Sequence, residues 1–399
     1  MPDSIYQAGK KDGQEIPAAP IFIYVHIPFC RSKCGYCAFN SRPLKSKTEL
    51  RTYFDALSIE IGLWRNRLAG TSPQTIFFGG GTPSLAEPEQ LSRLLQEIGA
   101  ATASADELRE ITLEANPDTL SFPLLQEYRQ IGINRVSLGV QSFATSALTF
   151  LERNHQPAQA LQSIRDARTA GFHNLGLDLI AGLPAPNSEF FRSDLEVALA
   201  HAPEHLSVYL LSLDEPSRLA QRVKSEKWRM PDAERQADIF LEIHDTLTGA
   251  GYEHYEVSNF ARPGFRAQHN SAYWSGAYYL GCGAGAHSYV EQDGRRIRMA
   301  NTTDPDEYVH QLSRGLAPTA FQEEITDEMN YRERLMLALR TSEGLDPNDF
   351  DSCKDKLVEE LTGLIDNGWY NWDGRRFRPT AAGMLVADGV AASLWDSIA

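Results

Sequence analysis

Six short apolar runs alternate with six longer helical patterns between residues 21 and 250. The runs read FIYVHI, TIFF, EITLEA, RVSLGV, NLGLDLIAG and HLSVYLL, and the helical patterns cover residues 50–68, 87–98, 122–131, 158–170, 188–200 and 233–250. Strands that are apolar along their whole length are buried on both faces, as they are in a parallel sheet covered by helices. The sequence therefore predicts an α/β fold, with an open or partial (β/α)6 barrel as its natural closure.

Residues suited to ligand contact follow the first five of these runs. The first run leads into a cysteine-rich loop, the second ends in GGGTP at residues 79–83, and the next three carry Glu114, Gln141 and Asp178 at or near their ends. In α/β barrels the chemistry gathers at the carboxyl ends of the strands. A glycine run lets a ligand approach the backbone and leaves amide donors free, although a tight turn uses the same residues. We therefore expect one ligand site at this end of the sheet.

The cysteine-rich loop reads CRSKCGYC and contains Cys30, Cys34 and Cys37 at the spacing Cys-x3-Cys-x2-Cys. Three thiolates can hold three corners of a cubane 4Fe-4S cluster, whereas an electron-transfer cluster takes four. The next two positions are Ala38 and Phe39, so the loop offers no fourth thiolate. The fourth iron would then be open to a small-molecule ligand.

Other interpretations of the cysteines stay open at this point. Zinc also binds closely spaced cysteines, and His26 could complete a Cys3His site, although His26 lies in an apolar run and no second knuckle follows. A redox or disulfide role is a further alternative. Cys282 could complete an electron-transfer cluster only if a second domain folds over the loop; otherwise Cys282 and Cys353 are buried small hydrophobes.

Composition limits the class of protein. The chain has 399 residues, 42% of them hydrophobic, and only five cysteines, which does not match a secreted disulfide framework. Neither a signal or transit peptide nor an apolar stretch of the about 20 residues that span a bilayer is apparent. A net charge of −15 disfavours nucleic-acid binding, which normally uses a basic face. We expect a soluble cytoplasmic protein.

Residues 252–289 are dense in aromatic residues, histidines and glycines. Such a composition suits a large flat ligand, and His254, His269 and His287 are potential axial donors to a haem iron. The alternative is a compact extension of the sheet whose histidines and tyrosines form structural hydrogen bonds.

The last seventy or so residues predict a separate helical piece with helices at 332–340, 354–366 and 381–394. Asp373-Gly374 between WYNW and RRF indicates a two-residue hairpin, so the piece resembles a winged helix. The hairpin carries Arg375, Arg376 and Arg378, which we interpret as solvated charges at a turn. We interpret the whole piece as a lid or protein-contact domain. We predict four parts. Residues 1–20 form a disordered tail, residues 21–250 the barrel, residues 251–320 an aromatic extension, and residues 321–399 this domain.

The motifs CRSKCGYC and GGGTP resemble those of the radical S-adenosylmethionine (SAM) superfamily, in which the amino and carboxylate groups of SAM chelate the open iron. Within it, nearly the whole chain resembles the oxygen-independent coproporphyrinogen III dehydrogenases and their relatives. The resemblance implies that SAM contacts fall at Tyr24, Tyr36, Gly80, Gly81, Thr82, Glu114, Gln141, Arg153 and Asp178. In the dehydrogenase some of these residues hold a second SAM, so Gln141, Arg153 and Asp178 would mark a retained pocket.

Two departures favour a different branch of these relatives. The chain lacks the further cysteine that the dehydrogenase carries after its third ligand, and only 23 residues precede Tyr24, too few for the dehydrogenase's N-terminal arm. Conversely, HNSAYW at residues 269–274 resembles the HNxxYW signature of the HemW group of haem chaperones. The resemblance implies haem handling by His269 and Tyr273 and a 4Fe-4S cluster with SAM. It also implies delivery of haem to apo-haemoproteins such as respiratory enzymes, and we expect a homodimer. The alternative function is radical oxidative decarboxylation of coproporphyrinogen III.

Overall fold

The computed structural model describes residues 19–69, 71–101, 109–185, 187–213, 217–350 and 353–398. The predicted tail therefore lies outside the described residues, apart from its last two, which begin the first strand. The chain forms two compact units. The first comprises the described residues up to Leu177 with 212–227 and 277–325, and the second comprises 178–211, 228–276 and the described residues from Thr326 onward.

The first unit is built on a mostly parallel sheet. Its strands lie in the order β14-β13-β12-β11-β1-β4-β5-β6. Five neighbouring strands are parallel: β11 (Tyr279–Cys282), β1 (Ala19–Ile27), β4 (Thr71–Gly80), β5 (Glu110–Ala115) and β6 (Arg135–Gln141). On the other side of β11 the pairing is antiparallel, with β12 (His287–Gln292), β13 (Arg295–Asn301) and β14 (Thr319–Ile325).

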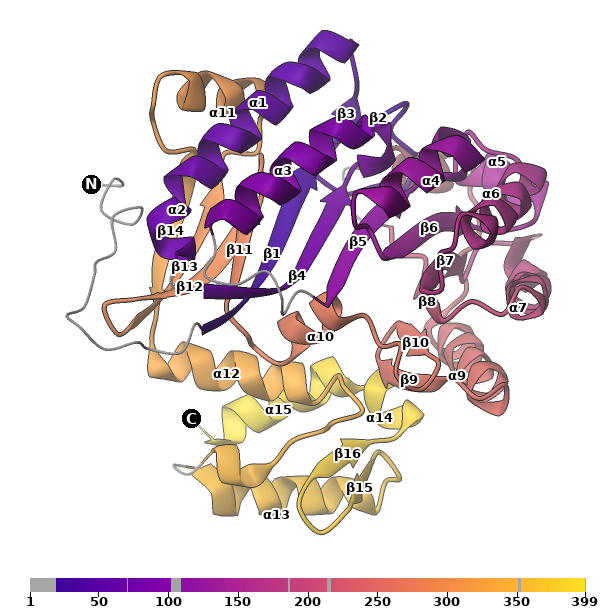
Figure 1. Ribbon diagram of the computed structural model, residues 1–399. Coiled ribbons are helices and arrows are strands. Elements are labelled where there is room, and N and C mark those ends of the chain that lie inside the picture. The colour runs from indigo at the N-terminus through magenta and orange to yellow at the C-terminus, as the bar shows by residue number, and fades with distance from the viewer. Residues whose placement is uncertain are drawn as a thin grey trace. The chain divides into compact units, whose positions relative to one another are not determined.

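Helices cover the face of this sheet on which apolar side chains are buried. In β1, for example, Ile23, Val25 and Ile27 are alternate residues on one face and are fully buried. Figure 1 shows α1 (Lys47–Leu63), α3 (Pro88–Ala101) and α4 (Phe122–Gln130) side by side over one face of the sheet. The remaining helices and short strands of the unit are α2 (Arg65–Leu68), α5 (Thr145–Phe150), α6 (Pro157–Thr169), α8 (Arg218–Ser225), α11 (Pro305–Ser313), β2 (Phe29–Cys30) and β3 (Arg42–Pro43).

A buried carboxyl joins three of these elements. Glu60 of α1 accepts hydrogen bonds from the Gly283 amide at 2.8 Å, from Asn301 Nδ2 at 2.6 Å and from the Tyr308 hydroxyl. Its complete burial raises the pKa of Glu60 to about 7, although these hydrogen bonds oppose the shift. Glu60 thus ties α1 to the segment after β11 and to α11.

The second unit contains the end of a strand that begins in the first unit, followed by three short antiparallel strands. The strand β7 (Leu175–Ala181) crosses from one unit to the other, and β8 (His205–Leu210), β10 (Asn259–Ala261) and β9 (Glu253–Glu256) follow it in that order. The helices here are α7 (Phe190–Ala200), α9 (Ala233–Gly249) and α10 (Gln268–Trp274).

The C-terminal part of the second unit has its own apolar core. It contains α12 (Asp327–Ala338), α13 (Lys354–Ile365), the hairpin β15 (Tyr370–Trp372) and β16 (Phe377–Pro379), α14 (Ala381–Leu385) and α15 (Ala387–Ile398). Leu339, Leu357, Leu361 and Tyr370 are fully buried in this core. The predicted hairpin turn is present, and Gly374 within it has a φ of +96°, which favours glycine.

The α/β prediction is confirmed, and each of the six predicted strands is present. The helix predicted at 50–68 is interrupted at Trp64, and the helix predicted at 381–394 is divided at Val386. The short helices α5 and α8 were not predicted, because six to eight residues hold too little periodicity. The predicted domain boundaries stay a prediction.

Candidate cofactor site

The cysteine loop is closed at both ends by backbone pairing in the first unit. The strand β2 ends at Cys30 and pairs in parallel with β3, and the Leu44 amide donates to the Cys30 carbonyl at 2.9 Å. Cys30 is buried, whereas Cys34 and Cys37 are partly exposed, and all three are free thiols. Burial raises the pKa of the Cys30 thiol, although Thr82 and Ser41 oppose the shift by hydrogen bonding; a bound iron would displace the proton.

The two metal interpretations of the cysteines require different ligand geometries. Among the described residues, no three His, Cys, Asp or Glu side chains lie close enough together to bind one metal ion. Zinc needs its ligands converging on one point, whereas a cubane cluster takes each thiolate on a different iron. His26, the fourth ligand of the zinc alternative, has both ring nitrogens occupied, by the Asn40 carbonyl at 2.8 Å and the Tyr24 hydroxyl at 2.9 Å.

The glycine run fits closely against the cysteine loop. Gly80 has a φ of +112°, and a Cβ atom there would overlap the His26 ring. A Cβ atom on Gly81 would lie 2.6 Å from the Phe29 carbonyl oxygen. The run therefore packs directly on the strands that lead to Cys30.

The amides of this run are not free, contrary to our expectation. Gly80 N donates to Glu114 Oε2 at 3.0 Å, Gly81 N to the Ile27 carbonyl at 2.9 Å, and Thr82 N to the Phe29 carbonyl at 2.8 Å. Thus Glu114 holds the glycine turn, as well as lying at the end of β5. The glycines are needed here for close approach and backbone conformation.

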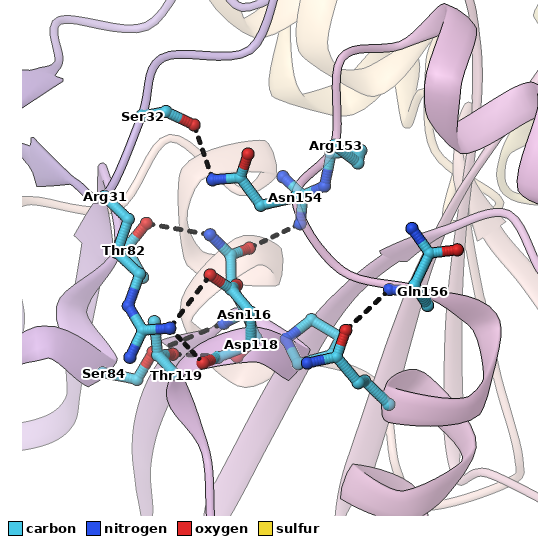
Figure 2. A network of polar contacts seen from close by, with 12 residues as sticks. Arg31, Ser32, Thr82, Ser84, Asn116, Asp118, Thr119, Arg153, Asn154 and Gln156 are labelled. Carbon is cyan, nitrogen blue, oxygen red and sulfur yellow. Dashed lines mark hydrogen bonds and ion pairs between the residues drawn. The ribbon is translucent and has the colours of Figure 1, made fainter.

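Asn116 is the centre of the polar network in Figure 2, and its role was not predicted from the sequence. Its Nδ2 donates to Thr82 Oγ1 at 2.9 Å, and its Oδ1 accepts from Arg153 Nη2 at 2.6 Å. Close by, Arg31 donates to Asp118, and Asn154 Nδ2 donates to Ser32 Oγ at 2.6 Å. The network thereby joins the cysteine loop, the glycine run and the ends of β5 and α5.

Arg153 brings a half-buried positive charge to the cysteines. Its Nη1 lies 3.5 Å from Cys34 Sγ, and its Nη2 also donates to the Gly139 carbonyl at 2.6 Å. Arg153 and Tyr36 interact, and burial is the main cause that raises the pKa of Tyr36. An anionic cluster or a ligand carboxylate would be stabilised by this cation.

The other predicted SAM residues lie as follows. Tyr24 on β1 stacks on Phe77 with ring centroids 6.0 Å apart. Gln141 ends β6 with a φ of +66°, which is rare for a residue other than glycine and is found more often at ligand sites. Asp178 lies on β7 in the second unit and is partly buried.

The helix α8 clamps the cysteine loop through Glu152. Arg218 and Arg222 of α8 each lie 2.9 Å from the Glu152 carboxylate, which packs against Gly35 so closely that a Cβ atom there would be 2.8 Å away. Arg218 also donates to the Lys33 carbonyl at 2.5 Å, and the Leu219 amide donates to the Gly35 carbonyl at 2.9 Å.

Of the predicted haem residues, His269 and Tyr273 lie on α10 and His254 lies on β9, all in the second unit. His269 is buried, and its Nε2 forms a hydrogen bond of 3.2 Å with the Tyr273 hydroxyl. His254 is also buried and contacts His244 Nδ1 at 2.9 Å, and its burial lowers its pKa to about 4. His287 is exposed and belongs to the first unit. His254 therefore forms structural hydrogen bonds, as the alternative interpretation of this segment expected.

Cys282, the possible fourth thiolate of the electron-transfer alternative, lies inside the sheet. It is fully buried on β11 beside Val25 of β1. Burial, and then the charge of Glu60, raise the pKa of this thiol well above its ordinary value. Cys282 behaves as a buried small hydrophobe.

Comparison with known proteins identifies the family. The model of the radical SAM superfamily matches residues 24–198, and the model of the HemN C-terminal domain matches residues 325–386. The heme chaperone HemW of Bacillus subtilis is 33% identical over 86% of this chain and 88% of that protein. The heme chaperone HemW of Mycobacterium tuberculosis is 32% identical over 95% of this chain and 96% of that protein. The chain belongs to the HemW family of radical SAM proteins.

The heme chaperone HemW of Escherichia coli is 38% identical over 72% of this chain and 75% of that protein. Among solved structures, the radical SAM enzyme coproporphyrinogen III oxidase (HemN) from Escherichia coli matches with a TM-score of 0.80 at 25% identity. The match covers 96% of this chain and 91% of that chain. These findings confirm the resemblance and the fold class drawn from the motifs. Membership of the HemW family implies a 4Fe-4S cluster and SAM. No described helix of this HemW-family chain is long and apolar enough to span a membrane.

Proposed function

We propose that this protein is a haem chaperone that carries a SAM-liganded 4Fe-4S cluster and delivers haem to apo-haemoproteins such as respiratory enzymes. The observation that carries the proposal is the HNSAYW segment on α10, within a chain that matches proteins named heme chaperone HemW along most of its length. The protein would act in the cytoplasm, because free cluster thiols need a reducing compartment.

Cys30, Cys34 and Cys37 would ligate three irons, and the fourth iron would take the amino and carboxylate groups of SAM. Tyr24, Tyr36, Gly81 and the Gly80–Glu114 pair would shape the SAM pocket, with Thr82 held by Asn116. Arg153 would offset the negative charge of the cluster. When reduced, a cluster of this kind can cleave the sulfonium of SAM, but a chaperone role requires only that the cluster be bound.

We assign Gln141, Arg153 and Asp178 to a second SAM pocket, as the resemblance to the dehydrogenase implies. The strained backbone of Gln141 supports this assignment. Haem would be bound at α10 through His269 and Tyr273. A hydrogen bond between these two side chains orients them on the same face of the helix. We also propose that the protein acts as a homodimer.

The enzyme alternative is favoured by one observation, the TM-score of 0.80 with coproporphyrinogen III oxidase. Against it stands the loop sequence, with Ala38 and Phe39 after the third cysteine. Both functions can be tested on one anaerobically reconstituted sample. We expect saturable, stoichiometric haem binding in a titration of the Soret band, and no protoporphyrinogen from coproporphyrinogen III, SAM and a reductant. Turnover to protoporphyrinogen without haem binding would contradict the proposal.

A further inference from the structure

The segment GCGAG, residues 281–285, covers the end of β11 and the turn after it. It belongs to the glycine-rich stretch 252–289, and the proposed function leaves it unexplained. Figure 1 shows β11 beside β1, the strand that leads to the cysteine loop, and the two strands pair in parallel. Two glycines of the segment have a positive φ, +108° at Gly283 and +75° at Gly285, which favours glycine.

Both of these glycines fit against residues that flank the cysteine loop. A Cβ atom on Gly283 would lie 2.5 Å from the His26 carbonyl oxygen, and one on Gly285 would lie 2.5 Å from Asn40 Nδ2. His26 precedes the three cysteines in the sequence and Asn40 follows them. The segment is therefore packed on both ends of the loop, within the first unit.

Asn40 joins the end of the loop to this segment. Its Nδ2 donates to the Ala284 carbonyl at 3.0 Å and to the Thr303 carbonyl at 2.9 Å. A carbonyl oxygen only accepts, so the amide nitrogen has to face both of them, and it uses both of its N–H groups. Among side chains of this size and shape, only asparagine supplies two such donors.

The helix α1 holds the segment in place behind these contacts. The Tyr53 hydroxyl accepts from the Ala284 amide at 2.8 Å and donates to the His26 carbonyl at 2.9 Å. Glu60 accepts from the Gly283 amide at 2.8 Å. Because Tyr53 and Glu60 are buried, Asn40 binds to a backbone that is itself fixed.

Ion pairs also fasten the residues after the loop, but they are more exposed. Asp306 of α11 lies 2.5 Å from Arg42 and 3.2 Å from Lys45, and its side chain is 64% exposed. Water and salt screen such pairs, so their contribution is small. The hydrogen bonds of Asn40 are therefore the more specific attachment.

A second chain of hydrogen bonds leads from Asn40 to Tyr24. The Asn40 carbonyl accepts from His26 Nε2 at 2.8 Å, so Nε2 carries the proton. Burial lowers the pKa of His26, which keeps the ring neutral and leaves Nδ1 as an acceptor. The Tyr24 hydroxyl, 2.9 Å from Nδ1, is then the donor. Its proton is directed at His26, and only its oxygen lone pairs can face a ligand.

We propose that Asn40 is a positioning residue of the cofactor site. Its side chain fastens the cysteine loop to GCGAG, and its carbonyl sets the orientation of the Tyr24 hydroxyl through His26. The inference rests on the proposed cluster at the three cysteines and adds what holds their loop. Asn40 acts through its neighbours, and the glycines of GCGAG are the space that it requires.

Asn40→Asp tests the attachment of the loop, because aspartate has the same shape and, at pH 8, no donor. The full-length protein is reconstituted anaerobically and exposed to an iron chelator, and the decay of the cluster absorbance is followed. The variant should lose its cluster about 5 to 20 times faster than the wild type. The matched control Asn371→Asp, exposed on β15, should keep the wild-type rate. Equal rates in the two variants would overturn the proposal.

The pH dependence of the same variant separates hydrogen bonding from shape. A protonated aspartic acid donates one hydrogen bond, and the two carbonyl oxygens that face it disfavour its ionised form. The rate of cluster loss in Asn40→Asp, divided by that in Asn40→Ala, should therefore fall as the pH is lowered from 8 to 6. A constant ratio would contradict a role through donated hydrogen bonds.

Two glycine variants test the same contact from the other side, without changing Asn40. Gly285→Ala brings a Cβ atom onto Asn40 Nδ2, whereas Gly294→Ala has the same backbone strain, with a φ of +77° against +75°, and open space around it. Gly285→Ala should accelerate cluster loss at least about fivefold, and Gly294→Ala should not. Equal acceleration would assign the effect to strain alone and overturn the proposal.

The effect on Tyr24 is tested by a double-mutant cycle on SAM binding, measured by equilibrium dialysis. Asn40→Asp should raise the Kd of SAM about three- to tenfold, and by at least about threefold less when Tyr24 is already phenylalanine. An equal increase in both backgrounds would exclude the connection through His26.

The outcomes separate this inference from the function on which it rests. A wild-type protein that binds a cluster, with Asn40→Asp and Gly285→Ala behaving as their controls do, would overturn the role of Asn40 alone. A wild-type protein that binds no cluster would overturn the proposed function and this inference together.

Discussion

Gly80 has no room for a side chain and adopts a backbone conformation that other residues rarely take. Its φ is +112°, and a Cβ atom would overlap the His26 ring. We expect Gly80→Ala to lower the free energy of unfolding by about 2–4 kcal/mol, since strain and overlap add. Urea denaturation measures this. Gly62→Ala is the control, because Gly62 lies in the exposed last turn of α1 and has room for a Cβ atom; it should stabilise by up to about 1 kcal/mol. Equal effects at both positions would contradict the account.

Glu60 should make the stability of the protein depend on pH. Its pKa is raised to about 7 in the folded state from an ordinary value of 4.5. Between these values the unfolded chain loses the proton that the folded chain keeps, so stability falls as pH rises from about 4.5 to 7. The fall should be on the order of 2–3 kcal/mol.

Glu60→Gln mimics the neutral carboxyl and should remove most of this dependence. Urea unfolding at pH 5 and at pH 8 measures it, with the exposed Glu89→Gln as the matched control. A wild-type protein that is as stable at pH 8 as at pH 5 would rule out the assigned pKa.

Arg153 should set the reduction potential of the cluster. Its guanidinium lies 3.5 Å from Cys34 Sγ, and reduction adds negative charge to the cluster. Removing this cation in Arg153→Gln should lower the midpoint potential by roughly 50–100 mV. An anaerobic redox titration followed by electron paramagnetic resonance tests this, and the exposed Arg31→Gln should shift the potential much less. Equal shifts in the two variants would exclude the assigned role.

At the scale of elements, α8 should govern how firmly the cluster loop is held. Glu152→Gln weakens both ion pairs to α8 and the contact at Gly35. We expect the variant to lose its cluster to an iron chelator roughly three to ten times faster, because loop opening becomes easier. The decay of the cluster absorbance under anaerobic conditions gives the rate. Asp55→Asn, which breaks the exposed pair with Arg93, should leave the rate unchanged; a rate unaffected by Glu152→Gln would show that α8 is not a clamp.

The elements differ in how well the sequence predicts them. Long runs such as EITLEA and RVSLGV coincide with β5 and β6, because buried parallel strands have a continuous apolar pattern. The helix α8 was missed, although Arg218 and Arg222 hold the cluster loop. Its role depends on Glu152, about seventy residues away in the chain, and no local pattern encodes such a pair.

At the scale of the whole molecule, the cysteines were found from their spacing, but the polar network behind them was not. Asn116 bridges Thr82 and Arg153, which come from separate elements. The sequence likewise identified residues 252–289 as dense in glycine, but not that Gly283 and Gly285 pack against His26 and Asn40. Both features arise only when distant segments fold together.

If the protein delivers haem, the rate of haem transfer should depend on the recipient protein. Haem-loaded protein is mixed with increasing concentrations of the apo form of a respiratory haemoprotein, and the Soret change is followed by stopped flow; apomyoglobin serves as a passive scavenger. Direct delivery predicts a rate that rises with the concentration of the respiratory recipient and exceeds release to the scavenger. A rate independent of recipient concentration and equal to passive release would contradict the account.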